Sequence, residues 1–159
     1  MKVIQADLFD LKQAQDIIYM LGHYAADIMG GGEALSAEVK LNLIPALQKR
    51  KTTLVILVYK EEHVVGLAIC FEGFSTFYAK PLINIHDFVV SAEYRGKGIA
   101  KMMLDKIEAI ARERNYCKIT LEVLEGNKRA QKIYQEFGFA GYELDKSMGK
   151  ALFWDKKLI

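Results

Sequence analysis

The sequence has few prolines and no long apolar run. Only Pro45 and Pro81 occur, and neither an internal repeat nor a low-complexity tract marks a linker between two domains. The longest apolar stretch, residues 64–71, falls well short of the roughly 18 residues that a membrane-spanning helix needs. The N-terminus also lacks the apolar stretch of a signal peptide. We therefore expect one domain over residues 1–159, with no membrane segment and a cytoplasmic location.

An excess of charge and a pattern of paired cysteines are also missing. There are 22 Lys and Arg against 20 Asp and Glu, with no basic arm interleaved with aromatic residues, so nucleic acid is not an expected partner. Cys70 and Cys117 form no Cys-x-x-Cys motif and do not stand among histidines at metal-binding spacing. We expect two buried thiols in a reducing compartment and no bound metal.

Apolar periodicity predicts two helices after a short N-terminal strand over residues 2–7. Apolar side chains recur at steps of three and four over residues 8–21, and again over residues 35–47. Between these helices lie Gly30, Gly31 and Gly32, whose backbone freedom suits either a plain hinge or a lid over a site.

The rest of the chain alternates between strand-like and helix-like segments. β-branched and aromatic residues, with one strongly amphipathic stretch, predict strands over 53–59, 64–71, 82–90 and 117–123, helices over 97–114 and 127–137, and final strands near 139–144 and 151–157. The strand–helix–strand unit from 82 to 123 requires parallel strands. The order predicts an α/β fold, with a mixed, mostly antiparallel sheet of about seven strands and helices on both faces.

A glycine-containing turn stands where the third long strand passes into the long helix. Gly96 and Gly98 remove side chains where the first helical turn leaves backbone N–H groups without partners, and Arg95 and Lys97 add positive charge there. These features favour a pyrophosphate site, and a tight structural turn explains the same glycines. The segment is neither a Walker loop nor a full dinucleotide fingerprint, because Lys101 replaces the third glycine.

These residues resemble the cofactor motif of the GNAT superfamily of N-acetyltransferases. That motif is Arg or Gln, two residues of any type, Gly, one residue of any type, and Gly or Ala, and residues 95–100 fit it throughout. Residues 127–139 resemble the second signature of the superfamily, and the order of elements resembles its fold from end to end. The resemblance implies the GNAT acyl-CoA N-acyltransferase fold, with acetyl-CoA as co-substrate.

The resemblance also implies which residues hold acetyl-CoA. The backbone of Phe88 and Val90, in the strand that includes Val89, would bind the pantetheine arm where a bulge separates this strand from residues 117–123. Asn127 and Ala130 would border the cofactor on the opposite side. The pyrophosphate would be surrounded by the motif and the residue after it: Arg95, Gly96, Lys97, Gly98, Ile99, Ala100 and Lys101.

Tyr134, His86 and Asp87 are the candidate catalytic residues. By resemblance Tyr134 would protonate the departing thiolate, whereas spacing alone makes it a core aromatic. The amine must lose a proton, and the ordinary pKa of histidine suits His86 as the base. In the similar polyamine N-acetyltransferases a Glu stands at that position. Strand alternation places His86 and Asp87 on opposite faces unless a bulge intervenes. The sequence therefore leaves three candidates for the general base: His86, Asp87 and a water chain. A purely structural role for His86 is an equal alternative.

Acceptor recognition is assigned to the part of the chain least similar to the superfamily. Tyr24, Asp27 and Glu33 lie around the three glycines, and Glu122 is a second contributor; solvated surface charge is the alternative for each acid. We expect direct acetyl transfer to a small primary amine in a ternary complex, without an acetylated Cys117.

Two other functions remain as alternatives. A peptide or protein N-terminus is a second kind of acceptor, and a sensor that binds acyl-CoA without turnover is a different class of protein. The superfamily also includes homodimers, for which Phe153 and Trp154 of the last expected strand offer an interface.

Overall fold

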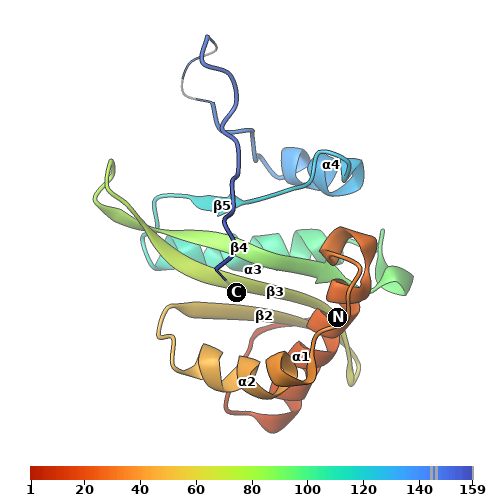
Figure 1. The fold of residues 1–159 in the computed structure, drawn as a ribbon. Helices are drawn as coiled ribbons and strands as arrows, with labels where there is room; N and C mark the ends of the chain where they lie inside the picture. Colours follow the sequence, from red (N-terminus) through yellow and green to blue (C-terminus); the bar gives the residue numbers. More distant parts are fainter. Residues whose placement is uncertain (144, 146, 159) are drawn as a thin grey trace.

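The computed structural model describes residues 1–143, 145 and 147–158 (Figure 1). Its elements, in chain order, are β1 (Lys2–Gln5), α1 (Leu11–Ala26), the short 3-10 helix η1 (Ile28–Gly30), α2 (Ala37–Gln48), β2 (Thr53–Lys60), β3 (His63–Ser75), β4 (Lys80–Val90), the 3-10 helix η2 (Ala92–Tyr94), α3 (Ile99–Glu113), β5 (Ile119–Leu121) and α4 (Lys128–Glu136). Within these residues, no helix is both long enough and apolar enough to cross a membrane.

The strands form one mixed sheet in the order β1-β2-β3-β4-β5. Neighbouring strands are antiparallel except for β4 and β5, which are parallel and are joined through α3. The expected meander and the expected parallel crossover unit are therefore confirmed, and both lie at the centre of the chain.

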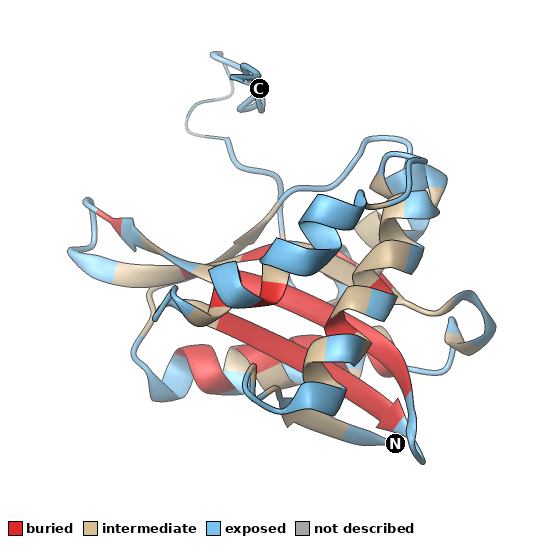
Figure 2. Cartoon of the chain, turned by 60° about the horizontal axis from the view of Figure 1, so that its bottom comes forward, coloured by how far each residue is buried: buried red, intermediate tan, exposed pale blue. Residues whose placement is uncertain are grey.

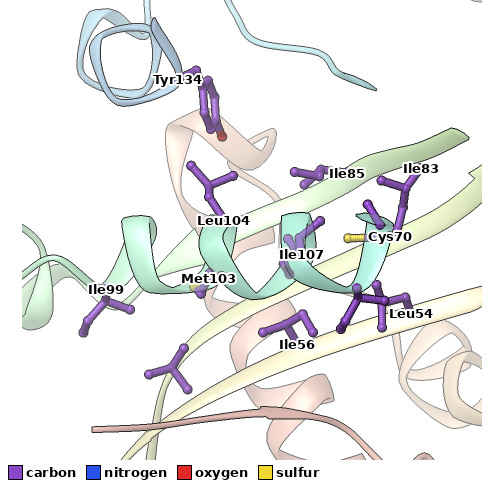
Figure 3. Close-up of a cluster of buried hydrophobic side chains, with 14 of the residues drawn as sticks. Leu54, Ile56, Cys70, Ile83, Ile85, Ile99, Met103, Leu104, Ile107 and Tyr134 are labelled. Carbon is purple, nitrogen blue, oxygen red and sulfur yellow. The ribbon is translucent and has the colours of Figure 1, made fainter. Parts of the chain in front are cut away.

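Helices cover both faces of the sheet, and each encloses an apolar layer. On one face α3 packs through Met103, Leu104 and Ile107, which are almost completely buried, and Tyr134 of α4 joins this layer (Figure 3). On the other face α1 and α2 supply the buried residues Ile17 and Leu47. The apolar residues that recur at steps of three and four in the sequence form these buried stripes. Each fully buried aliphatic side chain contributes about 1.5–3 kcal/mol to the free energy of folding. Figure 2 shows the buried residues concentrated along the central strands.

One glycine sets the distance between α3 and the sheet. A Cβ atom on Gly66 of β3 would lie 2.9 Å from the Met103 sulfur and 3.2 Å from a methyl group of Ile99. Contacts this short would require the side chains of Met103 and Ile99 to shift, so Gly66 allows the N-terminal half of α3 to pack closely on β3. This close approach fixes where the first turn of α3 stands relative to the end of β4.

The expected sheet of about seven strands is wrong, because the described residues form a sheet of five. The described residues after α4 form neither helix nor strand, and Figure 2 shows the end of the chain, marked C, away from the sheet. Leu144, the last residue of one expected strand, lies outside the described residues. Phe153 and Trp154 are 79% and 81% exposed. Strand propensity depends on a neighbouring strand and a packed face, and here the short β5 pairs with β4 without a further strand beside it in the described chain.

Candidate functional site

β4 contains an extra residue at its centre. Ile69 of β3 faces Asp87 while the next residue, Cys70, faces Ile85, so His86 is the inserted residue of a β-bulge. The bulge reverses the alternation of side chains along the strand. Ile85 before it packs with α3, whereas after it Phe88 packs on that side and Val89 packs with α1 and α2.

The bulge brings His86 and Asp87 to the same side of the sheet, where simple alternation would separate them. Both residues line one cavity beneath α1 and α2. The imidazole of His86 lies edge-on to the ring of Phe71, with 5.5 Å between ring centroids. His86 is exposed and Asp87 is half-buried.

β4 and β5 separate immediately after the bulge. Within the described chain their pairing covers only Ile83–Ile85 and Ile119–Leu121. The N–H of Ser91 donates to the carbonyl of Val65 on β3 over 3.0 Å. Because N–H groups alternate in direction along a strand, the N–H groups of Val90 and Phe88 point away from β3, into the opening left by β5.

A cavity of about 910 Å³ occupies this opening. Its walls come from β4, the segment from β5 to α4, the first turn of α3 and the length of α4, with Tyr24 and Asp27 contributed by the end of α1 and its C-cap. The size lies within the range of small-molecule and cofactor sites, roughly 300–1,000 Å³.

The glycine turn forms one end of this cavity. Gly96 and Gly98 have φ of +80° and +78°, in the left-handed region that favours glycine, and Gly98 is the N-cap of α3. Because Gly96 and Gly98 carry no side chains, neither residue covers the backbone N–H groups of the first turn of α3. The guanidinium of Arg129 approaches from α4, 3.9 Å from where a Cβ of Gly96 would stand. Backbone donors, a helix N-terminus and this cation together make the turn suitable for a polyanion.

Arg95 connects the turn to the loop after α1. Its Nε donates to the carbonyl of Val90 over 3.1 Å, and its Nη2 lies 3.1 Å from a carboxylate oxygen of Asp27. Asp27 also caps η1 by accepting from the N–H of Met29. This backbone hydrogen bond and the bond from Arg95 together lower the pKa of Asp27.

Tyr134 of α4 lines the large cavity, and Figure 3 shows its side chain pointing from α4 toward the apolar layer of α3. Its ring makes edge-to-face contacts with Phe88 and Phe139, at centroid distances of 5.9 and 5.8 Å. Burial, and secondarily the nearby Tyr24, raises the pKa of Tyr134 to about 12. The hydroxyl is therefore a neutral proton donor throughout the physiological pH range.

A second, smaller cavity of about 340 Å³ lies on the α1 and α2 side of β4. Tyr24 and His86 line both cavities, so the two spaces adjoin at the bulge. Burial raises the pKa of the Asp87 carboxyl, and the adjacent His86 opposes this effect. The pKa of Tyr24 is raised by burial and then by the charge of Asp87.

The structure brings most of the residues expected from the sequence to these two cavities. The large cavity is lined by His86, Phe88, Val89, Val90, Arg95, Gly96, Gly98, Ile99, Ala100, Lys101, Glu122, Asn127, Ala130, Tyr134, Tyr24 and Asp27. Asp87 lines the smaller cavity. Lys97 and Glu33 are exposed and, among the described residues, line neither cavity.

Sequence reasoning missed several lining residues. Arg129 and Lys132 of α4 face the large cavity, as do Tyr94 of η2 and Met29 of η1. The two basic residues lie inside the 127–139 segment and one helical turn apart, a signal that was available in the sequence. Met29 had no such signal, because its position depends on how the loop after α1 folds back.

Comparison with known proteins relates this chain to acetyltransferases. The family model described as "Acetyltransferase (GNAT) family" matches residues 23–139. The uncharacterized N-acetyltransferase YycN of Bacillus subtilis (strain 168) is 30% identical over 149 residues, which cover 86% of this chain and 90% of that protein.

Two further proteins are similar over different extents. Thialysine N-epsilon-acetyltransferase of Bos taurus is 33% identical over 75 residues, and the match covers 47% of this chain and 44% of that relative, so the chain spans less than half its length. A crystal structure described as that of a "probable acetyltransferase" superposes with a TM-score of 0.80 at 20% identity, covering 99% of this chain and 100% of the other. At that identity the superposition shows the fold alone.

Proposed function

We propose, because the chain belongs to the acetyltransferase (GNAT) family, that it transfers the acetyl group of acetyl-CoA to the primary amine of a small molecule. One observation carries the proposal: the glycine turn before α3, the open edge of β4 at Phe88–Val90 and the hydroxyl of Tyr134 border one cavity. A polyanion site, an extended row of backbone donors and a proton donor are what a CoA thioester requires.

The residues around the cavity fit acetyl-CoA. The N–H groups of the first turn of α3, with Arg129 beside them, would hold the pyrophosphate, and the open edge of Phe88 and Val90 would bind the amide-containing arm. Asn127 and Ala130 of α4 would form the opposite wall. When bound, acetyl-CoA supplies a thioester whose carbonyl carbon accepts an amine nucleophile.

Tyr134 would act as the acid for the leaving thiolate. Its ring is fixed by Phe88 and Phe139, and its raised pKa keeps the proton on the hydroxyl at neutral pH. The outward-facing N–H of Val90 would stabilise negative charge on the carbonyl oxygen. Together they serve the two atoms on which negative charge develops during thioester aminolysis.

His86 and Asp87 are the candidate groups for accepting the proton of the amine. The bulge brings them to one side of β4 next to the smaller cavity, and His86 also borders the large one. A residue at the boundary of the two spaces is suitably placed to act between an acetyl donor in one and an amine in the other.

Direct transfer in a ternary complex is supported by the position of Cys117. Among the described residues this thiol lines neither cavity, and its Sγ lies 3.9 Å from the carbonyl of Lys80 near the start of β4. The glycine turn follows the opposite end of β4, so Cys117 and the turn lie at different ends of this strand. Cys70 and Cys117 are both free thiols, which supports a reducing, cytoplasmic location.

Release of CoA thiol from acetyl-CoA tests the proposal. The purified chain is incubated with acetyl-CoA and a panel of primary amines, and the N-acetyl product is identified by mass spectrometry. We expect thiol and N-acetylated amine in equal amounts, above the hydrolysis seen without amine. Tight binding of acetyl-CoA by calorimetry, with no acetylated product from any amine, would favour the acyl-CoA sensor and contradict the proposal.

A further inference from the structure

We propose that the acetyl acceptor is a compact apolar monoamine, whose apolar group occupies the smaller cavity and whose ammonium pairs with Asp87. The inference rests on the proposed function and adds the class of amine. It excludes as preferred acceptors the polycationic amines and the amino acids.

The smaller cavity is apolar on most of its surface. The lining side chains that carry no charge come from α1, the segment before α2, α2 itself and β3: Leu21, Ala25, Leu35, Leu43, Leu47, Ile69 and Phe71. Its volume of about 340 Å³ is near the lower limit of small-molecule sites. A cavity of this size and composition suits a single aromatic ring or a branched alkyl group.

The polar groups stand at one end of the cavity, where it adjoins the larger one. These groups are Tyr24, His86 and Asp87, and Asp87 is the one carboxylate among the described lining residues. This half-buried carboxylate balances one ammonium, and the approach of that cation favours the ionised form of Asp87. An amine held there lies beside His86 and Tyr24, the two residues shared with the acetyl-donor cavity.

The other acidic side chains do not converge on this cavity. Asp27 is paired with Arg95 at 3.1 Å, Glu122 lines the large cavity from beyond β5, and Glu33 is exposed. A second ammonium held in this cavity would therefore lie among apolar side chains, where no opposite charge compensates for its loss of water. The site as described suits one positive charge and no more.

An acceptor carboxylate also lacks a Lys or Arg partner among the described lining residues. Lys and Arg side chains are absent from that lining, and Arg50 instead lies against the ring of Phe71, 5.3 Å from its centroid. A free amino acid would bring its carboxylate close to Asp87, which like charge disfavours. The site therefore favours an amine without other charges.

Comparison of acceptors tests the inference directly. At saturating acetyl-CoA, kcat/KM is measured for 2-phenylethylamine and isoamylamine, and for spermidine, thialysine and kanamycin. We expect the two apolar amines to be favoured at least tenfold. A preference for spermidine, thialysine or kanamycin would overturn the inference and leave the proposed function standing. Absence of any N-acetylated product would overturn both.

A matched pair of variants on α1 tests the location. Ala25 lines the smaller cavity, whereas its neighbour Ala26 is exposed and lines neither cavity of the described chain. Ala25→Leu should raise the KM for 2-phenylethylamine at least tenfold and leave the calorimetric Kd for acetyl-CoA unchanged. Ala26→Leu should change neither. Equal KM values in the two variants would contradict the location.

Two more variants test the same location independently, in case Ala25→Leu does not fold. Leu35→Phe narrows the cavity from the segment before α2 and should act in the same direction. Asp87→Asn removes the charge while preserving shape, and should raise the KM for amines at least tenfold without changing the Kd for acetyl-CoA. An unchanged KM in folded Asp87→Asn would show that the ammonium does not bind there and would overturn the inference.

Discussion

Arg95 and Asp27 are 68 positions apart in the sequence, yet their side chains meet at 3.1 Å across the mouth of the large cavity. The pair links the turn before α3 to the loop after α1. That loop contributes Met29 to the cavity, and the last turn of α1 before it contributes Tyr24. The ion pair therefore joins the wall that would hold the acetyl donor to the one that faces the acceptor.

Asp27→Asn should loosen this connection at a small cost in stability. Asparagine still accepts the cap hydrogen bond of η1, so the change removes mainly the charge. A partly exposed ion pair contributes about 0.2–1 kcal/mol. Because folding holds the pKa of Asp27 below its unfolded value, this contribution is present above about pH 4 and is lost as the pH falls through the lowered pKa. Urea unfolding should show a difference from wild type at pH 7 that shrinks toward pH 3; a difference that grows in acid would contradict this account.

Tyr134→Phe should lower kcat by about 10²–10⁴-fold, because it removes the proton donor while keeping the ring contacts with Phe88 and Phe139. The melting temperature and the Kd for acetyl-CoA should change little. Since the pKa of Tyr134 is raised to about 12, its deprotonation should not limit the wild-type rate near pH 10.

Tyr116→Phe is the control for this substitution. Tyr116 donates a hydrogen bond to Glu72 and, among the described residues, lies outside both cavities. Its kcat should remain within twofold of wild type. Full activity of Tyr134→Phe would remove the tyrosine from the mechanism.

Gly98→Ala should destabilise the fold by about 1–2 kcal/mol and weaken acetyl-CoA binding. An added Cβ at Gly98 meets nothing within 4 Å, so the cost arises from its φ of +78°. Gly22→Ala in α1 is a matched control: its Cβ also meets nothing within 4 Å, and its backbone is helical, so it should stabilise by about 0.5–1 kcal/mol. Thermal unfolding and calorimetry measure the two effects, and equal shifts for the two variants would contradict the backbone explanation.

The two thiols should differ in reactivity. Cys70 is fully buried, and burial raises its pKa to about 12, whereas Cys117 is partly exposed. Ellman's reagent should titrate one thiol per folded chain and two in denaturant. Cys117→Ser should abolish the fast reaction and leave acetyl transfer within twofold of wild type. Loss of turnover in Cys117→Ser would instead indicate an acetyl-cysteine intermediate.

Much of the fold was predictable because it depends on local patterns. The buried stripe of α3 and the β-branched content of β2 and β3 indicate their elements directly, and the motif at residues 95–100 locates the junction of β4 and α3. The last two strands were not predictable in the same way. The adjacent aromatic residues Phe153 and Trp154 suit a strand, but pairing depends on a neighbour that local sequence does not specify.

The site was predictable in its cofactor half and less so in its acceptor half. Gly96, Gly98 and Tyr134 belong to contiguous motifs. The bulge at His86 depends on the register between β3 and β4, a long-range property, so the sequence left the orientation of His86 and Asp87 open. Glu33 lies close in sequence to cavity residues but is turned to solvent, because the loop after η1 takes positive φ at Gly31 and Gly32.

The inserted residue of β4 also predicts how this chain tolerates changes in length. Removing His86 would restore regular pairing, because Ile85 already faces Cys70 and Asp87 already faces Ile69 on β3. Every later residue of β4 would keep its partner and its side of the sheet, so the loss would be confined to the imidazole between the two cavities. A one-residue deletion elsewhere in β4 would instead shift the register and move side chains to the opposite face. The strand is therefore expected to tolerate loss of its inserted residue better than loss of any other residue.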